Sequence, residues 1–294
     1  MSQTYDVLGI GEVLWDLQPH GRQLGGAPGN FAYHCHAQGL RAAPISAVGD
    51  DDEGSELLQT LQDRGVDTSL ISALKDVPTG TVDVELDNGK PTYTIHESVA
   101  WDRIPMTDDA LAAARSARAV CYGTLAQRDA VSRETILQLL DATKPDCLRV
   151  FDVNLRQSFY DADIVDGGLR RATVFKLSDD ETDEVGRLLK MPLDPEPFGE
   201  ALFERYPNLS LLVLTRGGDG SLLRRRDGEQ SDQPTVKSEV KSTVGAGDSF
   251  TAGVVTGLLQ GRPLAETHAF ASKLAAFVVS QSGAMPELPD DLKL

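Results

Sequence analysis

The feature that most constrains the fold of this chain is an alternation of short apolar runs with longer amphipathic stretches. Six runs rich in β-branched residues read YDVLGIG, APISAVG, RAVCYG, LRVFDVN, TVFKLS and SLLVLT, and the amphipathic stretches include residues 52–64, 131–142 and 264–281. Strands that are apolar on both faces lie inside parallel sheets, and the stretches between them supply the covering helices. The alternation predicts an α/β fold with a mostly parallel sheet flanked by helices.

Length and charge limit the organisation and the partners of the protein. No tandem repeat, low-complexity tract or Pro/Gly/Ser-rich linker divides the 294 residues, so we interpret residues 1–294 as one domain. The net charge of -17 argues against a nucleic acid or an anionic membrane as partner, because both need clustered Lys and Arg. No apolar run approaches the roughly 20 residues of a membrane span, and the N-terminal residues lack a signal-peptide pattern. We therefore expect a cytoplasmic protein.

One segment departs from the parallel pattern. In TVDVELDNGKPTYTIHES, Asn88-Gly89 is a strong two-residue hairpin turn, and it pairs Asp87 with Lys90. Counting outward from this turn gives one apolar face, formed by Val82, Val84, Leu86, Pro91, Tyr93 and Ile95. A hairpin with such a face is marginally stable alone and needs a cover, which is the main domain, a ligand or a second subunit. We predict a small β lid, with segments around residues 13–24 and 78–100, through which a homodimer can form.

Near the N-terminus, the stretch LGGAPGNFAYHCHAQGL (residues 24–40) places three glycines before an expected helix. Gly25, Gly26 and Gly29 lack a Cβ, so the main chain there can adopt positive φ and approach a ligand closely. Asn30 stands where a helix cap belongs. The pattern fits a small polar ligand held by backbone groups, and it equally fits an ordinary Gly-rich turn with an N-cap.

A second glycine motif, STVGAGDSFTAGVVTGLL, spans residues 242–259. The amides of Gly245, Ala246 and Gly247 would open a helix, where the helix dipole favours an anion such as phosphate. Asp248 puts a carboxylate in the same first turn, where it is either a general base for an attacking hydroxyl or simply a favourable helix-start acid. No G-x-x-x-x-G-K-[ST] motif occurs, and GIGEVL and GAGDSF lack the third glycine of a dinucleotide fingerprint. A dehydrogenase is therefore the weaker alternative.

Taken together, GGAPGN and GAGD resemble the two sequence motifs of the PfkB/ribokinase family of carbohydrate kinases. The resemblance covers nearly the whole chain and includes GEVLWDL, FDVNLR, KLSDDE, TRGGDGS and SGAMPELP. Several of these segments, with HESVAWDRI, look more like bacterial fructokinases than like ribokinases or adenosine kinases. The resemblance implies a ribokinase-like fold with a small β lid, and an ATP-dependent kinase that phosphorylates a primary hydroxyl of fructose or a related ketose.

The resemblance also implies roles for individual residues of the sugar site. Asp248 would be the general base, and the amides of residues 245–247 would stabilise the charge on the moving phosphoryl group. Gly25, Gly26, Asn30 and Asp16 would bind the sugar. Arg103 and Arg156 would reach the sugar or the phosphoryl group, although surface ion pairing is an equally simple role for them.

For the nucleotide, the resemblance places the loop with Thr215, Gly217 and Gly220 over ATP, and the helix 264–281 with Gly283 at the adenine. Lys176 would counter phosphate charge. Glu181 lies at a magnesium-associated Asn-x-x-Glu motif, in which Ser178 replaces the Asn, and would act on magnesium through water. Ser242 stands where many relatives carry an Asp beside a potassium ion, so potassium is expected to bind weakly.

Two alternatives to a fructokinase stay open at this point. One is a kinase for another polyol, such as ribose, 2-keto-3-deoxygluconate or a nucleoside. The other is a sugar- or nucleotide-binding regulator without turnover, since a fold alone does not establish activity.

Overall fold

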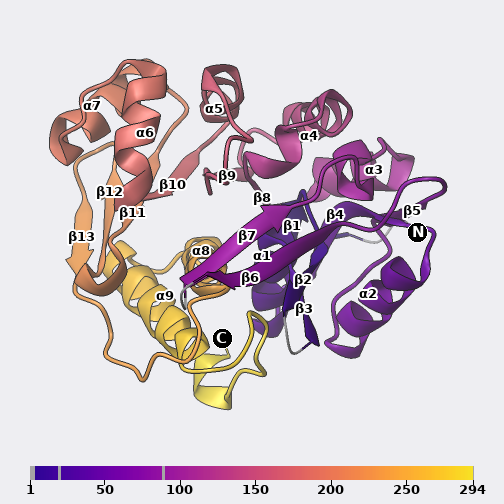
Figure 1. Ribbon diagram of the computed structural model, residues 1–294. Coiled ribbons are helices and arrows are strands. Elements are labelled where there is room, and N and C mark those ends of the chain that lie inside the picture. The colour runs from indigo at the N-terminus through magenta and orange to yellow at the C-terminus, as the bar shows by residue number, and fades with distance from the viewer. Residues whose placement is uncertain (1–3, 19–20, 88–89, 294) are drawn as a thin grey trace.

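All six apolar runs form neighbouring parallel strands in the computed structural model, which describes residues 4–18, 21–87 and 90–293. The large sheet has nine strands in the order β13-β12-β11-β10-β9-β8-β1-β4-β5 (Figure 1). Its parallel part consists of β1 (Val7–Ile10), β4 (Ala42–Gly49), β5 (Ile71–Leu74), β8 (Ala119–Tyr122), β9 (Leu148–Asp152), β10 (Val174–Ser178) and β11 (Leu211–Thr215). The antiparallel strands β12 (Ser221–Arg225) and β13 (Gln230–Gln233) complete one edge.

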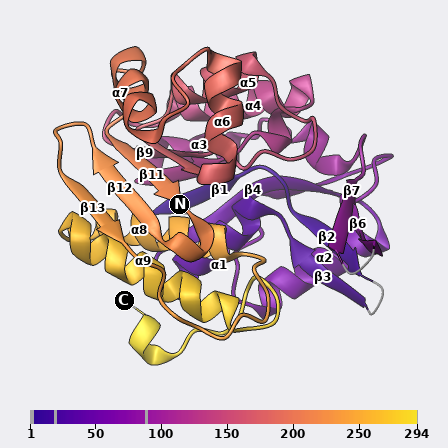
Figure 2. The same cartoon turned by 60° about the vertical axis from the view of Figure 1, so that its left-hand side comes forward.

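Helices cover both faces of this sheet, as predicted (Figure 2). One face carries α1 (Ala27–Ala37), α2 (Asp52–Asp63), α8 (Ala246–Leu259) and α9 (Leu264–Val279). The other carries α3 (Asp108–Ser116), α4 (Ala130–Ala142), α5 (Ala162–Leu169), α6 (Asp179–Leu189) and α7 (Pro195–Arg205), and four short 3-10 turns are η1 (Ala100–Arg103), η2 (Leu125–Gln127), η3 (Gly217–Asp219) and η4 (Asp290–Leu292). Among the described helices, none has both the length and the apolar character that crossing a membrane requires.

Successive side chains of a strand point to opposite faces of the sheet, so each strand contributes to the core on both faces. Leu8 and Ile10 of β1 pack into the cluster that includes α3 to α7, whereas Val7 packs with α1, α8 and α9. Both faces of β1 are therefore fully buried, which explains why the run reads as continuously apolar rather than alternating.

A second, four-stranded sheet forms the predicted β lid. Its strands are β3 (Gly21–Gly25), β2 (Leu14–Gln18), β6 (Thr81–Asp87) and β7 (Lys90–Ile95), in this order, with β2 and β6 parallel and the other pairs antiparallel. The predicted hairpin register is confirmed, since Val82 pairs with Ile95 and Val84 with Tyr93. The turn at Asn88-Gly89 and the side chain of Leu86 lie outside the described residues.

The apolar face of the lid hairpin is covered mainly by the body of the protein. Val82 and Ile95 are buried in the same core cluster as Trp101, and Val84 packs against that cluster. Tyr93, in contrast, is 47% exposed. Of the three covers considered from the sequence, the main domain accounts for Val82, Val84 and Ile95.

The carboxyl ends of the parallel strands meet at one edge of the large sheet, because parallel strands all point the same way. Asp152 and Thr215 are the last residues of β9 and β11, and Lys176 pairs with Asp152 from the middle of β10. In open α/β sheets, ligands bind outside this edge. The N-terminus of α8 lies at the same edge, next to Lys176.

Candidate active site

The two glycine motifs, which are far apart in the sequence, meet in space. Nδ2 of Asn30 donates a hydrogen bond of 2.7 Å to Oδ2 of Asp248, across a separation of 218 residues. Asn30 is 3% exposed, and its Oδ1 has no partner within the described structure. A buried amide oxygen without a partner is unfavourable unless a donor is supplied to it. The site therefore offers an acceptor to a hydroxyl-bearing ligand.

The structure corrects one sequence interpretation, that of Asn30 as a helix cap. The N-cap of α1 is Gly26, with φ of 104°, and Asn30 lies one turn inside the helix, where its own amide donates to the carbonyl of Gly26. Pro28 occupies the second helical position, where a missing N–H costs nothing. Because Asn30 is inside the helix, its side chain is free to reach across to α8.

Gly25 and Gly26 are bare because other parts of the protein approach them closely. A Cβ on Gly26 would lie 2.4 Å from the carbonyl oxygen of Glu12, and one on Gly25 would lie 2.6 Å from Oδ2 of Asp16. Burial raises the pKa of Asp16 to about 6, and Arg156 opposes that rise. The predicted sugar-binding residues Gly25, Gly26, Asn30 and Asp16 are thus gathered at one end of the site.

The free amides at the N-terminus of α8 lie next to the ammonium group of Lys176. Gly245 is the N-cap of this 14-residue helix, with φ of 79°, and a Cβ there would lie within 2.9 Å of Ala284. A Cβ on Gly247 would lie 3.2 Å from Nζ of Lys176. The helix dipole and the lysine both favour an anion here, and the glycines leave room for it.

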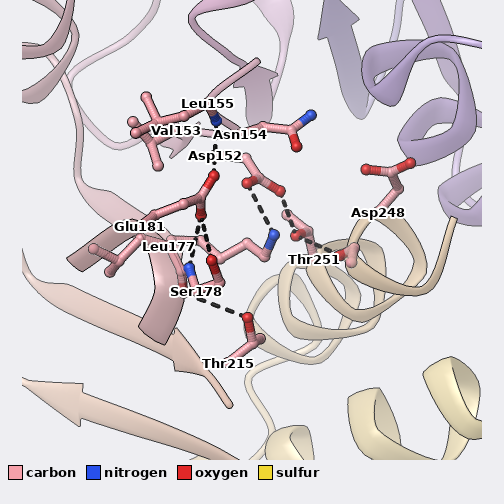
Figure 3. A network of polar contacts seen from close by, with 12 residues as sticks. Asp152, Val153, Asn154, Leu155, Leu177, Ser178, Glu181, Thr215, Asp248 and Thr251 are labelled. Atoms are coloured by element: carbon pink, nitrogen blue, oxygen red, sulfur yellow. Dashed lines mark hydrogen bonds and ion pairs between the residues drawn. The ribbon is translucent and has the colours of Figure 1, made fainter. Parts of the chain in front are cut away.

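Lys176 belongs to a buried polar network, drawn in Figure 3. Its Nζ donates to Oδ1 of Asp152 at 2.9 Å, and Oγ1 of Thr251 donates to Oδ2 of Asp152 at 3.1 Å. Lys176 is 7% exposed and Asp152 is 5% exposed. Burial disfavours the ammonium, but Asp152, Glu181 and Asp248 outweigh burial and raise the pKa of Lys176. Lys176 therefore stays charged at neutral pH.

The carboxyl group of Asp248 holds a proton more readily than an ordinary aspartate. Burial and the neighbouring Asp152 raise its pKa to about 6, against the opposing effects of Asn30, Lys176 and Arg156. At neutral pH the group is largely ionised, yet its proton affinity lies near the working pH. This is the range in which a general base is most effective.

The raised pKa predicts that Asp248 reduces stability when it is ionised. Because its folded-state pKa lies above its unfolded value, its stabilising contribution is present at low pH and is lost as the pH rises through about 6. We expect Asp248→Asn to raise the melting temperature by a few degrees at pH 8. Calorimetry at pH 5 should show a smaller gain. An equal or lower melting temperature for the variant at pH 8 would contradict this account of the site.

A large cavity opens beside the N-terminus of α8. Its volume is about 750 Å³, within the range of small-ligand sites. Its lining residues come from seven elements and their loops, and include Thr215, Gly217, Gly220, Ala246, Gly247, Phe250, Ser272, Ala275, Ala276 and Val279. Three predicted nucleotide-loop residues and the helix 264–281 are therefore brought together. The sequence analysis missed residues 234–238 and Val240, which line one side of the cavity.

Gly283 lies elsewhere than its predicted place. It does not line the large cavity but a separate hollow of about 320 Å³, together with Trp15 and Arg22. The turn that contains Gly283 follows α9, and Ala284 packs against Gly245. The neighbouring turn thus supports the start of α8 rather than lining the large cavity.

Glu181 has its carboxylate oxygens occupied by protein donors. Oε2 accepts from the amide and the hydroxyl of Ser178 at 2.8 and 2.9 Å, which forms the capping box of α6. Oε1 accepts from the amide of Leu155 at 2.7 Å. Ser178, which stands at the Asn position of the motif, is therefore the N-cap of α6 and binds Glu181. Within the described chain, no cluster of three or more His, Cys, Asp or Glu side chains could by itself hold a metal ion.

The two arginines predicted for the sugar or phosphoryl group are placed differently. Arg156 follows β9 and lowers the pKa values of Asp16 and Asp248, so its charge faces the site. Arg103 is exposed at the end of η1, and no hydrogen bond or ion pair of the described structure links it to the site residues. The electrostatics thus place the charge of Arg156 at the site, and the role of Arg103 stays a prediction.

Arg128 ties the base of the lid to the body of the protein, and no sequence signal marks it. Its guanidinium donates to both oxygens of Asp102, at 2.7 and 2.9 Å, and to the carbonyl of His96. It also stacks over Trp101 and Phe159, with centroid distances of 4.0 and 4.5 Å. A buried arginine hydrogen-bonded through Nε and Nη2 is a rigid support for the end of β7, and its Nη1 has no partner within the described structure.

Comparison with known proteins places this chain in one family. The model of the pfkB family of carbohydrate kinases matches residues 12–291. A sugar kinase of Pyrococcus horikoshii is 27% identical over 92% of this chain and 85% of its own, and its crystal structure with ATP has a TM-score of 0.81. An ATP-dependent 6-phosphofructokinase of Thermoanaerobacterium thermosaccharolyticum is 25% identical, covering 98% and 92% of the two chains.

The fold likeness extends to a more distant structure. A fructokinase of Xylella fastidiosa with bound ATP is 22% identical, with a TM-score of 0.85 over 98% of this chain and 96% of that one. The Pyrococcus protein is named for no particular sugar, and the other two are named for different acceptors. The likeness therefore identifies the kind of fold and not the sugar.

Proposed function

Since this chain belongs to the pfkB family of carbohydrate kinases, and is a sugar kinase of that family, we propose that it transfers the γ-phosphoryl group of ATP to a primary hydroxyl of a ketose, fructose first among the candidates. The observation that carries the proposal is the position of Asp248. Its carboxylate lies on the first turn of α8, hydrogen-bonded to Asn30 on one side and next to the large cavity at Ala246 and Gly247 on the other.

In the proposed reaction, the acceptor hydroxyl lies against Asp248 and the sugar ring against Asn30 and Asp16. The carboxylate of Asp248 takes the hydroxyl proton as the oxygen attacks phosphorus. The amides of residues 245–247 and the ammonium of Lys176 stabilise the negative charge on the phosphoryl oxygens. Such preorganised donors need no reorganisation as the charge develops.

The nucleotide is assigned to the cavity of about 750 Å³. Supporting this, ATP is bound in the related Pyrococcus structure, which shares the fold over 95% of this chain. The apolar side chains of Phe250, Ala275 and Val279 offer a surface for the adenine, and Thr215 and Gly217 lie on the loop that would cover it. Gly283 lines another hollow, and its contact with the nucleotide stays a prediction.

The lid sheet is proposed to close over the sugar. Asp16 is on β2 of the lid, so the sugar-binding carboxylate and the lid hairpin move together. Closure would keep water from competing as acceptor. Pairing of this lid with that of a second copy stays a prediction, and the exposed Tyr93 is the residue that it would cover.

Magnesium is implied by the family. The donors on this chain suit contact with the ion through water molecules rather than direct ligation. Both oxygens of Glu181 are engaged, so Glu181 would act on the ion through water. Mg²⁺ keeps several waters and uses the nucleotide phosphates as ligands, so no protein cage is required. When bound with ATP, the ion neutralises phosphate charge.

Potassium fits this chain poorly, because Ser242 supplies a neutral hydroxyl at the expected carboxylate position. That hydroxyl already accepts the amide of Val244 at 3.2 Å. We predict that activity depends little on potassium and that Ser242→Asp creates or strengthens the dependence, since an added carboxylate favours a cation.

The potassium prediction is checked by titrating KCl at constant ionic strength without sodium. Thermal stability is followed in the same titration as a readout that needs no turnover. Strong saturable activation of the unmodified protein would show that main-chain carbonyls suffice and that the prediction is wrong.

The proposed function is tested by a coupled assay of ADP formation with a panel of acceptors. Fructose and other ketoses are expected to be phosphorylated, with Asp248→Asn as the blank. Preferred turnover of ribose, 2-keto-3-deoxygluconate or a nucleoside would support the kinase activity but show that the acceptor is not fructose. ATP and sugar binding without any ADP formation would favour the non-catalytic regulator.

A further inference from the structure

A small cavity lies on the inner side of Asp248, between α1, α8 and the ends of β1, β8 and β9. Its volume is about 10 Å³, which is close to the space that one water molecule needs. Three carboxyl groups line it, those of Glu12, Asp152 and Asp248. Its other lining residues include Cys121, Tyr122, Thr124, Asn154 and Thr251. Apolar atoms, with Ala27, Pro28, Phe31 and Leu125 among the lining residues, form most of its wall, and the three carboxyl groups supply the hydrogen-bond partners that one water molecule would use.

Glu12 is the member of this cluster that the proposed function leaves without a role. It follows β1 and is 4% exposed. Oε1 of Glu12 accepts a hydrogen bond of 3.3 Å from the amide of Ala27, the first residue of α1. No ion pair of the described structure includes Glu12, whereas Asp152 is paired with Lys176. An unpaired buried carboxyl group is unfavourable when charged, so it readily holds a proton.

The electrostatics of the cluster agree with this placement. Burial raises the pKa of Glu12 to about 7, and the charge of Asp248 adds to the rise while Arg156 opposes it. Asp248 itself also faces Asp152, Lys176 and Arg156. Among the other lining groups, Asp152 is ion-paired with Lys176, whereas Cys121 and Tyr122 stay neutral because burial raises their pKa values. Glu12 and Asp248 therefore titrate as a coupled pair with two proton affinities close to each other.

We propose that Glu12 accepts, through one water molecule in this cavity, the proton that Asp248 takes from the sugar hydroxyl. As the bond from the sugar oxygen to phosphorus forms, the bond from phosphorus to the bridging oxygen breaks, and ADP leaves with that electron pair. The protonated Asp248 donates to the water, and the water donates to the carboxylate of Glu12. The step moves one proton and needs no further reactant. The inference rests on the proposed function, because it requires Asp248 as the base.

Glu12→Gln separates a proton-accepting role from a structural one. The amide oxygen of Gln can still accept the hydrogen bond from Ala27, but the side chain cannot take a proton. We expect the single-turnover rate of phosphoryl transfer at pH 8 to fall about tenfold or more. Glu204→Gln, at an exposed position on α7, is the matched control and should leave the rate unchanged.

The pH dependence of the rate distinguishes a proton-accepting role of Glu12 from a structural one. Glu12 must be ionised to accept the proton, so the wild-type rate should rise in two steps, near pH 6 and near pH 7. In Glu12→Gln a single step should remain, because one member of the coupled pair no longer titrates. A rate that falls uniformly and keeps both steps would show a purely structural role and overturn the proposal. An unchanged rate would overturn it as well.

A measurement on the resting protein separates this inference from the proposed function. Infrared spectroscopy should show a protonated carboxyl band that disappears as the pH rises through about 7 and is missing in Glu12→Gln. A protein that shows this band but phosphorylates no sugar would contradict the proposed function and the relay that rests on it, while leaving the carboxyl pair intact. A resting protein without the band would overturn the relay whatever its activity.

Discussion

Replacing Asp248 with asparagine is expected to lower kcat by about a hundredfold to ten-thousandfold, the usual range for loss of a general base. Asparagine has the same shape, and its oxygen can still accept the hydrogen bond that Asn30 donates at 2.7 Å. It cannot accept a proton from the acceptor hydroxyl. Sugar affinity, measured by calorimetry, should therefore change little, so the loss appears in kcat and not in binding.

The matched control for this variant is Asp163→Asn. Asp163 is an exposed acid in the first turn of α5, so it shares the helix-start position of Asp248 without facing a ligand site. If Asp248 were only a favourable first-turn acid, both variants would behave alike. Near-normal turnover of Asp248→Asn would remove the general-base assignment.

Lys176→Met should have the second largest effect, on stability and on turnover together. The variant leaves the carboxylate of Asp152 buried without the ammonium that now lies 2.9 Å away. Breaking one partner of a buried ion pair typically costs about 3–5 kcal/mol of unfolding free energy. Loss of the charge beside Gly247 should also lower kcat about a hundredfold, because it removes a preorganised cation from the phosphoryl group.

A double variant separates these two effects. Asp152→Asn together with Lys176→Met removes both charges, so most of the lost stability should return in urea unfolding while turnover stays low. Lys75→Met, at an exposed position, is the control and should change neither quantity. Full turnover in the double variant would show that the lysine supports the fold alone.

Local patterns were sufficient for the fold and for much of the site. The six apolar runs became six parallel strands because strands buried on both faces are continuously apolar, as β1 is with Val7, Leu8 and Ile10. The turn chemistry predicted the pairing of Val82 with Ile95. The resemblance to one family predicted that Asn30 and Asp248 would come together, which spacing alone could not indicate.

The roles of some other residues depend on tertiary contacts, which a local sequence pattern does not indicate. Asn30 reads as a cap because its residue type caps helices, but the helix starts earlier, at Ala27. Gly283 lies in the turn that supports the start of α8, and only the packing of Ala284 on Gly245 shows this. Glu12 lies in a quoted motif, yet its chemistry follows from burial beside Asp248, which the sequence does not display.

The central claim is that phosphoryl transfer takes place at the start of α8 with Asp248 as base. Its most direct test is a crystal structure of the protein with a non-hydrolysable ATP analogue and the best acceptor from the sugar panel. We predict the primary hydroxyl within hydrogen-bonding distance of Asp248, the adenine in the cavity beside Phe250 and Val279, and the γ-phosphate against the amides of residues 245–247. A nucleotide bound outside that cavity, or an acceptor hydroxyl pointing away from Asp248, would contradict the account.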